Sequence, residues 1–291
     1  MTSESMATSG NSPSNSSTSG NASSGNPSAG ISPSGGGSSL QRSSELTRFR
    51  LAPNPGPMSL DGTNSYVIGA PGSGRVAVVD PGPEDEQHLA ELAATGRVDV
   101  VLITHRHADH TEASARFHAL TGAPVRAALA EYCHGGEPLH DGEVLNVGDV
   151  EIRVVATPGH TSDSLCFHLP GDGPTGSVLT GDTILGRGTT VLDYPDGKLG
   201  DYLASLDRLE ALGPATLLPA HGPVLPALDV KCREYRDHRE QRLDQIRTAL
   251  DRLGQDAPIG AVTDAVYPDV DPSVRWAAET SVAAQLDYLR S

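Results

Sequence analysis

The chain has 291 residues, and its 37 acidic and 21 basic side chains give a formal net charge of −16 at pH 7. A chain this acidic repels polyanions at long range, which argues against strong nonspecific nucleic-acid binding and leaves open only a local basic groove. Its length suits one large domain or a domain with an accessory module. No stretch approaches the ~18 apolar residues of a membrane span.

Residues 1–45 are dominated by Ser, Gly, Asn, Pro and Thr. Such a segment buries too little apolar surface to offset the entropy of ordering it, so we predict a disordered tail. It lacks the apolar run of a secretory signal, and its single basic residue, Arg42, argues against an organelle transit peptide. The three cysteines, Cys133, Cys166 and Cys232, are scattered, which fits a reducing compartment. We therefore expect a cytoplasmic protein.

After the tail, strands and helices alternate along the chain. Hydrophobic periodicity predicts strands over 65–68, 75–79, 100–103, 151–155, 164–169, 177–179 and 215–218. It predicts helices over 88–94, 111–120, 202–212 and 230–253, and two shorter helical segments over 258–267 and 273–289. Strands with helices outside them and polar residues in the loops indicate an α+β fold, a four-layer αββα sandwich. We expect this domain to span 46–227 and a small helical module to span 228–291.

The segment His105-Arg106-His107-Ala108-Asp109-His110 comes just after the apolar run 100–103. It places three imidazoles and a carboxylate, which are ligand types of zinc-class ions, within six residues. Further residues of this kind follow at later strand-to-loop junctions, namely His160, Asp182 and His221. A chance cluster of surface histidines would give the same letters, but recurrence at several strand ends favours a metal site. The other histidines lack such neighbours and are interpreted as surface or helix residues: His88, His118, His134, His140, His168 and His238.

The number of ligand-type residues suits two metal ions that share one ligand. The expected ligands of the first ion are His105, His107 and His160, those of the second are Asp109, His110 and His221, and Asp182 is expected to bridge the two ions with its two carboxylate oxygens. Ions bound in this way lower the pKa of water toward ~7, so the expected nucleophile is a metal-bound hydroxide. Asp109 is the candidate catalytic residue because it can also orient that hydroxide. The positive charge of the ions predicts an anionic or polarised substrate.

The order of these residues resembles the signature of the metallo-β-lactamase superfamily: His-x-His-x-Asp-His at 105–110, then His160, Asp182 and His221. The resemblance covers about residues 58 to 225 and implies the αββα sandwich with a binuclear, usually zinc, site. It also implies that Asp80 supports the site without binding metal. Superfamily members that hydrolyse β-lactams usually have a cysteine where Asp182 stands, so β-lactam hydrolysis is expected only as a weak side reaction.

A narrower resemblance is to the β-lactamase-like protein 2 subfamily. The segments that carry it are 157–164, 181–190, 201–206 and 219–224, together with the helical segment 235–242. It implies a winged-helix-like C-terminal module, which fits the helices predicted over 228–291. The wing is expected to be shortened or absent, because residue 291 falls about where it would begin. Animal members of the subfamily are endoribonucleases that act on single-stranded RNA.

These observations predict a metal-dependent hydrolase with two Zn²⁺, or with Mn²⁺ or Fe²⁺ in their place. Single-stranded RNA is the first predicted substrate, from the subfamily resemblance. The alternative is a small anionic thioester, as in hydroxyacylglutathione hydrolase, and the acidic chain with only 4% aromatic residues favours it. A metal-bearing nucleic-acid-binding protein without turnover is a third hypothesis, which the complete ligand set disfavours.

The helix predicted at the start of the C-terminal module is rich in arginine, and acidic residues are interspersed among its basic ones. Alternating charge signs favour a solvated, ion-paired helix face. The alternative is that several of these arginines line the substrate cleft and hold phosphates.

Overall fold

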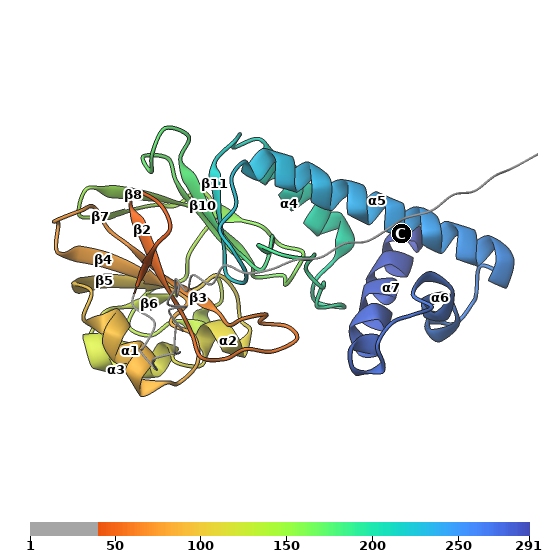
Figure 1. The fold of residues 1–291 in the computed structure, drawn as a ribbon, viewed down its shortest axis with the longest axis horizontal. Coiled ribbons are helices and arrows are strands. Elements are labelled where there is room, and N and C mark those ends of the chain that lie inside the picture. Colours follow the sequence, from red (N-terminus) through yellow and green to blue (C-terminus); the bar gives the residue numbers. More distant parts are fainter. Residues whose placement is uncertain (1–39) are drawn as a thin grey trace, which may run out of the picture. The chain divides into compact units, whose positions relative to one another are not determined.

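The computed structural model describes residues 40–291, which form two β-sheets stacked face to face (Figure 1). The first sheet has the order β1-β2-β3-β4-β5-β6, with strands β1 (Gln41–Arg42), β2 (Thr47–Leu51), β3 (Asn64–Ile68), β4 (Arg75–Val79), β5 (Arg97–Leu102) and β6 (Val125–Arg126). The second has the order β11-β10-β9-β8-β7, with strands β7 (Val144–Val147), β8 (Val150–Ala156), β9 (Leu165–Leu169), β10 (Ser177–Gly181) and β11 (Thr216–Pro219). β4 is parallel to β5, β5 to β6 and β10 to β11, whereas the other neighbours are antiparallel.

A hydrophobic core fills the space between the two sheets. Ile68 and Leu102 of the first sheet belong to the same buried cluster as Ile152, Phe167 and Leu218 of the second. In β8 the inward side chains recur at every second residue, because successive side chains of a strand point to opposite faces. The packing of these two apolar faces fixes the position of one sheet relative to the other, and with it the positions of the loops at the strand ends.

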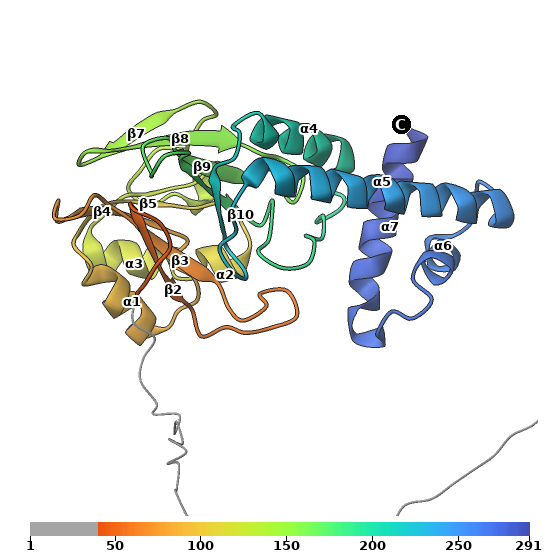
Figure 2. The same cartoon turned by 45° about the horizontal axis from the view of Figure 1, so that its top comes forward.

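Helices cover the outer face of each sheet, as the view in Figure 2 shows. On the first sheet lie α1 (Glu86–Ala93), α2 (Ala108–Thr111) and α3 (Ser114–Thr121), and α1 and α3 bury Leu89 and Phe117 against β-strand residues. On the second sheet lie α4 (Leu199–Glu210) and α5 (Leu228–Leu253), whose Tyr202, Leu206 and Tyr235 share one buried cluster with strand residues. The predicted αββα sandwich is therefore confirmed.

The C-terminal part is helical throughout its length. α6 (Ile259–Val266) and α7 (Arg275–Arg290) pack against the C-terminal half of α5, where Ile246 and Leu250 meet Val262, Val282 and Leu286. Two short 3₁₀ turns, Ala130–Tyr132 and Pro272–Val274, complete the elements. All of residues 228–291 are described and none of them lies in a strand. The helices predicted over residues 228–291 are thus present.

Several sequence-based boundaries differ from the structure. The helix predicted over 111–120 is broken into α2 and α3, and the sequence does not predict β2, β6 and β7. β1 lies inside the predicted tail and pairs with β2, so the fold begins earlier than residue 46; residues 1–39 of that tail lie outside the described part of the chain. The predicted boundary at 228 coincides with the start of α5, but this helix packs against both α4 and the last two helices.

Within residues 40–291, no helix is both long enough and apolar enough to cross a membrane. The longest helix, α5, carries charged side chains along its whole length.

Candidate metal centre

The seven predicted ligands all lie in segments that follow strand ends. His105, His107, Asp109 and His110 follow β5, with the last two on α2; His160 follows β8, Asp182 follows β10 and His221 follows β11. The paired strands of each sheet and the core between the sheets carry these four segments to one place. The sequence spacing between them is large, so only the tertiary fold brings them together.

The ligand atoms form two adjacent groups. In the first group, His107 Nδ1 lies 3.0 Å from His105 Nε2 and 3.2 Å from His160 Nε2. In the second group, Asp109 Oδ2 lies 3.4 Å from His110 Nε2 and 3.2 Å from His221 Nε2.

The Asp182 carboxylate lies between the two groups. Its Oδ1 is 3.2 Å from His221 Nε2, and its Oδ2 is 3.8 Å from His160 Nε2. Each oxygen thus faces a different group, which is the arrangement expected of a shared ligand.

The donor atoms fit zinc-class ions. Zinc lies 2.0–2.1 Å from histidine nitrogen in tetrahedral sites, so two nitrogen ligands of one ion are separated by about 3.3 Å. The separations within both groups are close to this value. Three of the buried atoms, His110 Nε2, Asp182 Oδ1 and His221 Nε2, approach only other candidate ligands, and none of these contacts has hydrogen-bond geometry. Unpaired buried polar atoms are rare unless an ion or water satisfies them, so the donor set suits metal ions.

The outer ring nitrogens of His160 and His221 contact oxygen atoms that can fix the orientation of each ring. His160 Nδ1 lies 2.6 Å from the Val191 carbonyl, and His221 Nδ1 lies 3.1 Å from the Gly62 carbonyl. With the outer nitrogen donating to oxygen, the inner nitrogen is left as the acceptor that binds metal. These carbonyls come from loops that carry no sequence signal of their own.

Asp80 organises the ring of His110 and the start of the histidine segment. Its carboxylate accepts hydrogen bonds from Thr104 N at 2.8 Å and Thr104 Oγ1 at 2.7 Å, and it lies 2.8 Å from His110 Nδ1. The Thr104 hydroxyl in turn lies 3.1 Å from His105 Nδ1. Asp80 has a positive φ of 51°, a conformation that costs energy for a residue with a side chain. It does not belong to either group of candidate ligands, in keeping with a supporting role.

Asp193 contacts His107 and is not predicted from the sequence. Its Oδ2 lies 3.2 Å from His107 Nε2 and accepts a hydrogen bond from Arg106 Nη2 at 2.6 Å. The same Arg106 nitrogen donates to Asp196 at 2.9 Å. Arg106 therefore ties the histidine segment to the 190–197 loop, and Asp193 completes a carboxylate–histidine pair behind the first ligand group.

Burial and neighbouring charges shift the pKa values of Asp182 and His221 in opposite directions. Burial opposes ionisation of Asp182, but His221 and other imidazoles outweigh it and hold its pKa below the ordinary range. Burial likewise opposes protonation of His221, while Asp182 and Asp109 raise its pKa to about 10. His160 differs, because burial lowers its pKa to about 4. The carboxylates thus stay ionised and attract positive charge, which either protons or metal ions supply.

Gly159 allows the segment before His160 to pack closely against α4. Its φ is +143°, and a Cβ atom at this position would lie 2.4 Å from Tyr202 Cα. Such an approach is shorter than a van der Waals contact, so a side chain here would displace the His160 segment or the helix. The glycine in Thr157-Pro158-Gly159-His160-Thr161 is therefore a steric requirement of the site.

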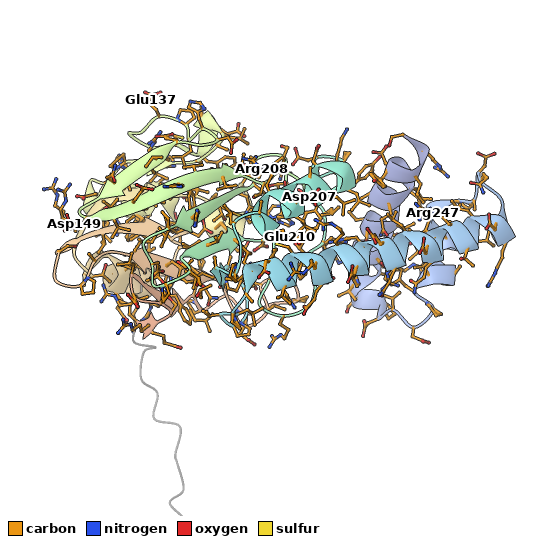
Figure 3. The ribbon with its side chains drawn as sticks, turned by 90° about the horizontal axis from the view of Figure 1, so that it is seen from above. Glu137, Asp149, Asp207, Arg208, Glu210 and Arg247 are labelled. Carbon is orange, nitrogen blue, oxygen red and sulfur yellow. The ribbon has the colours of Figure 1, made fainter. Side chains whose placement is uncertain are left out.

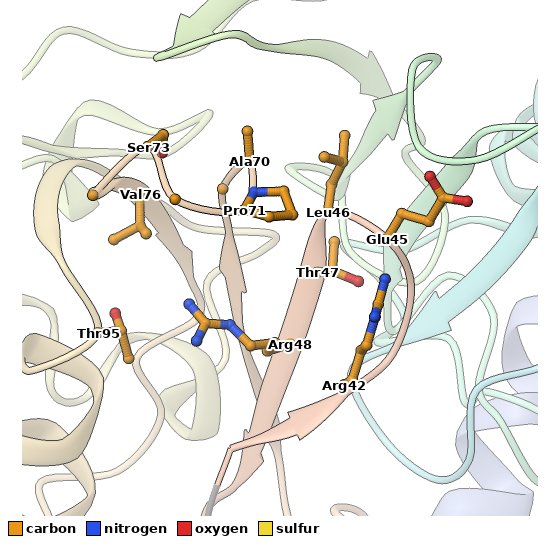
Figure 4. A pocket seen from close by; sticks show the side chains of 13 residues that line it. Arg42, Glu45, Leu46, Thr47, Arg48, Ala70, Pro71, Ser73, Val76 and Thr95 are labelled. Carbon is orange, nitrogen blue, oxygen red and sulfur yellow. The ribbon is translucent and has the colours of Figure 1, made fainter.

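A cavity of about 460 Å³ lies elsewhere on the first sheet, as Figure 4 shows. It is lined by Arg42 and Arg48 near the N-terminal strands and by the 69–74 turn between β3 and β4. The turn lies at the opposite end of β4 from Asp80, and none of the seven candidate ligands lines the cavity. This cavity is therefore separate from the candidate metal centre.

Comparison with known proteins agrees with this geometry. Residues 58–221 match the family model of the metallo-beta-lactamase superfamily. An atrochrysone carboxyl ACP thioesterase of Aspergillus fumigatus is 35% identical over 212 residues, which cover 70% of this chain and 64% of that protein. A beta-lactamase-like protein 2 homolog of Caenorhabditis elegans is 30% identical over 259 residues, which cover 85% of this chain and 84% of the homolog.

Among solved structures, a metallo-beta-lactamase family protein of Thermus thermophilus superposes with a TM-score of 0.68 at 25% identity, over 84% of this chain and 93% of the other. The fold and site define a metal-dependent hydrolase of the αββα type. The chain belongs to the metallo-β-lactamase superfamily.

Proposed function

We propose that the seven side chains hold two metal ions, zinc in the native protein, and that the enzyme hydrolyses a thioester of a small anionic carrier. The main support is that Arg233, Arg236 and Arg247 of α5 form ion pairs and that Arg239 is buried, which interrupts a cationic face for a nucleic acid along that helix. The acidic chain, with a net charge of −16, points the same way, because long-range repulsion disfavours a polyanionic substrate.

The exposure of the ligand side chains indicates where a substrate enters. Asp109 and His107 are each 31% exposed, whereas His110 and His221 are fully buried. Bound metal ions would supply an acidified water and polarise a carbonyl oxygen. Burial opposes ionisation of Asp109, but the neighbouring His110 and His221 keep its pKa well below the ordinary range. Asp109 can therefore accept a hydrogen bond from an attacking water molecule and orient it toward a carbonyl carbon at the open face.

The arginines at the start of α5 form ion pairs with α4. Arg233 and Arg236 both contact Glu210 at 3.0 Å, and Arg236 also pairs with Asp207. Figure 3 shows Asp207 and Glu210 on α4 beside α5. Further along, Arg239 is buried and its Nη2 donates to the Thr190 carbonyl at 2.5 Å. The ion-paired interpretation of this helix therefore fits better than a continuous phosphate-binding face.

The name of the Aspergillus fumigatus relative gives independent support to the thioester class, since that protein is a carrier-protein thioesterase. The chain spans 64% of that protein's length. A thioester substrate has to place only one carbonyl group at the metal ions. Unlike a single-stranded nucleic acid, it does not need to stack on aromatic side chains, so the low aromatic content of the chain does not hinder its binding.

Cleavage of single-stranded RNA is the second candidate function. The observation that favours it is the match to the Caenorhabditis elegans protein, which extends over 84% of that protein, well beyond the metal-binding domain. The net charge of −16 weakens the case, because a chain this acidic repels a polyanion such as RNA at long range.

The two functions are separated by assaying one preparation on both substrates. Metal-loaded protein is tested on a glutathione and a coenzyme A thioester and on a single-stranded RNA, with Asp182→Ala as the inactive variant. Thioester hydrolysis is expected to fall by about 100-fold or more, since even supporting residues of metal sites contribute 10- to 100-fold. Asp251→Ala, at an exposed position of α5, is the matched control and should keep full activity.

RNA cleavage that disappears in Asp182→Ala, together with no thioester hydrolysis by the parent enzyme, would replace the thioester proposal. Nuclease activity that survives the substitution would come from a contaminant and would count for neither function.

A further inference from the structure

A small cavity lies where α5 meets the last two helices. Its volume is about 240 Å³, far more than a single water molecule needs. We call it the α5–α7 cavity, and the lining residues that matter below are Thr190, Val191, His238, Arg239, Arg242 and Ser281. The full lining includes two arginines and a histidine but no acidic residue, although the chain has 37 acidic side chains.

Polar atoms of these basic side chains are left without partners. His238 Nδ1 and Arg239 Nε are both buried, and neither has a hydrogen-bond partner among the described residues. Arg242 places its guanidinium over the ring of Tyr267, 4.4 Å from the ring centre, and donates one hydrogen bond to Gln245. Arg242 thus has no carboxylate partner among the described residues, and an anion in the cavity would supply one.

The local electrostatics are positive in a protein that is negative overall. Burial, and then Arg239 and Arg242, lower the pKa of His238, and no carboxylate acts against them. His238 is therefore neutral near pH 7 and can donate one hydrogen bond, while the two guanidinium groups supply the charge. This is the usual chemistry of a phosphate or carboxylate subsite.

One backbone segment separates this cavity from the metal centre. Thr190 and Val191 line the cavity, and the Val191 carbonyl accepts the hydrogen bond of His160 Nδ1 at 2.6 Å. Arg239, on the cavity side, donates to the Thr190 carbonyl. A ligand that reaches from the metals to the cavity must therefore be extended, with its anionic group away from the reacting carbonyl.

We propose that the α5–α7 cavity binds the phosphate of the carrier arm of the thioester substrate, of the kind found in coenzyme A and on acyl carrier proteins. This inference rests on the proposed thioester hydrolysis. Arg242 and His238 contact the phosphate, and the flexible arm runs past the 189–191 segment so that its thioester carbonyl lies at the metal centre.

The test measures binding without turnover. The probes are 4′-phosphopantetheine and pantetheine, which differ only by the phosphate, and their affinities for the metal-loaded full chain are measured by calorimetry. The parent protein should prefer the phosphorylated probe by about tenfold or more, the contribution of one charge-assisted hydrogen bond. Arg242→Gln, which removes a cation, and Ser281→Glu, which adds a carboxylate, should each abolish the preference.

Arg247→Gln is the matched control, because Arg247 lies on the same helix, pairs with Asp244 and does not line the cavity. It should keep the preference. A preference that survives in both cavity variants, as phosphate bound at the metals would give, overturns the proposal, as does the lack of any preference in the parent protein.

The outcomes for binding and for catalysis are distinguishable. A phosphate preference without thioester hydrolysis supports the cavity and removes the proposed activity, whereas hydrolysis without the preference removes only the cavity. Single-stranded RNA is a third probe. If Arg242→Gln weakens RNA binding and leaves 4′-phosphopantetheine binding unchanged, RNA is the occupant and the proposal is wrong.

Discussion

At the scale of single residues, the site depends on side chains that position the candidate ligands. Five imidazoles and two carboxylates are effective as a metal site only if each ring presents the correct nitrogen, and this is set by Asp80, Asp193 and backbone carbonyls behind them. Of these, Asp193 is the most informative to change, because it contacts His107, one of the two most exposed candidate ligands.

Asp193→Asn should weaken metal binding by about 10- to 100-fold, the usual effect of losing a partner behind a ligand histidine. The substitution keeps the shape of the side chain but removes the negative charge that holds His107 Nε2–H and Arg106. Metal affinity is measured by competition with a chelator of known affinity.

The control for this prediction is Asp196→Asn, which also contacts Arg106 but does not touch His107. Its metal affinity should stay within about threefold of the parent value, since Asp196 contacts Arg106 and Ser162 at the surface but none of the seven candidate ligands. Equal losses in both variants would assign the effect to the Arg106 contacts rather than to the histidine.

At the scale of elements, α5 connects the metal-binding domain to the C-terminal helices and also supports the loop after Asp182. The Tyr235 hydroxyl accepts a hydrogen bond from Leu185 N at 3.0 Å and donates to the Gly188 carbonyl at 2.9 Å. The side chain is buried, so water cannot replace these contacts easily. The helix thus fixes the backbone that follows β10.

Tyr235→Phe should lower the free energy of unfolding by about 1–3 kcal/mol, because it leaves a buried amide without its acceptor. Chemical denaturation measures the change. Tyr288→Phe on α7 is the matched control, since that ring is 38% exposed, and it should be close to neutral. A loss no larger than that of the control would show that the loop does not depend on the Tyr235 hydroxyl.

At the scale of the whole molecule, acid stability should depend on a histidine outside the metal centre. The sequence favours a surface or helix position for His88; it lies in α1 but is fully buried, with Nε2 2.9 Å from Ser65 Oγ. Burial, followed by the charge of Arg50, lowers its pKa from 6.5 to about 4. The unfolded chain therefore takes up a proton at a higher pH than the folded protein does.

The stability contributed by neutral His88 is present above pH 6.5 and is lost as the pH falls from 6.5 toward 4, by about 3 kcal/mol in total. Urea denaturation at several pH values across this range measures it. The loss should be smaller in His88→Gln than in the parent protein, while His140→Gln, at an exposed position, should match the parent. Identical pH profiles for parent and His88→Gln would contradict the prediction.

The sequence alone determined the elements whose signals are local. Residues 150–154 alternate as a half-buried strand does, and the apolar positions of α4 recur with helical spacing, so both are predicted to within a few residues. The seven candidate ligands are also evident, because His-x-His-x-Asp-His is an unusual concentration of ligand-type side chains. Short edge strands such as β6 and β7 lack such signals, since their pairing depends on neighbours elsewhere in the sheet.

Only the tertiary structure decided what lies behind those ligands and around the cavity. Asp193, the Val191 carbonyl and the Gly62 carbonyl contact histidines that are 31 to 159 residues away in the chain. Such partners are set by how loops fold back over the sheets, and a carbonyl carries no side-chain identity that a sequence could reveal. The same holds for α5, whose arginines look alike in the sequence, while the fold pairs some with α4, buries Arg239 and leaves Arg242 facing a cavity that has no acidic lining.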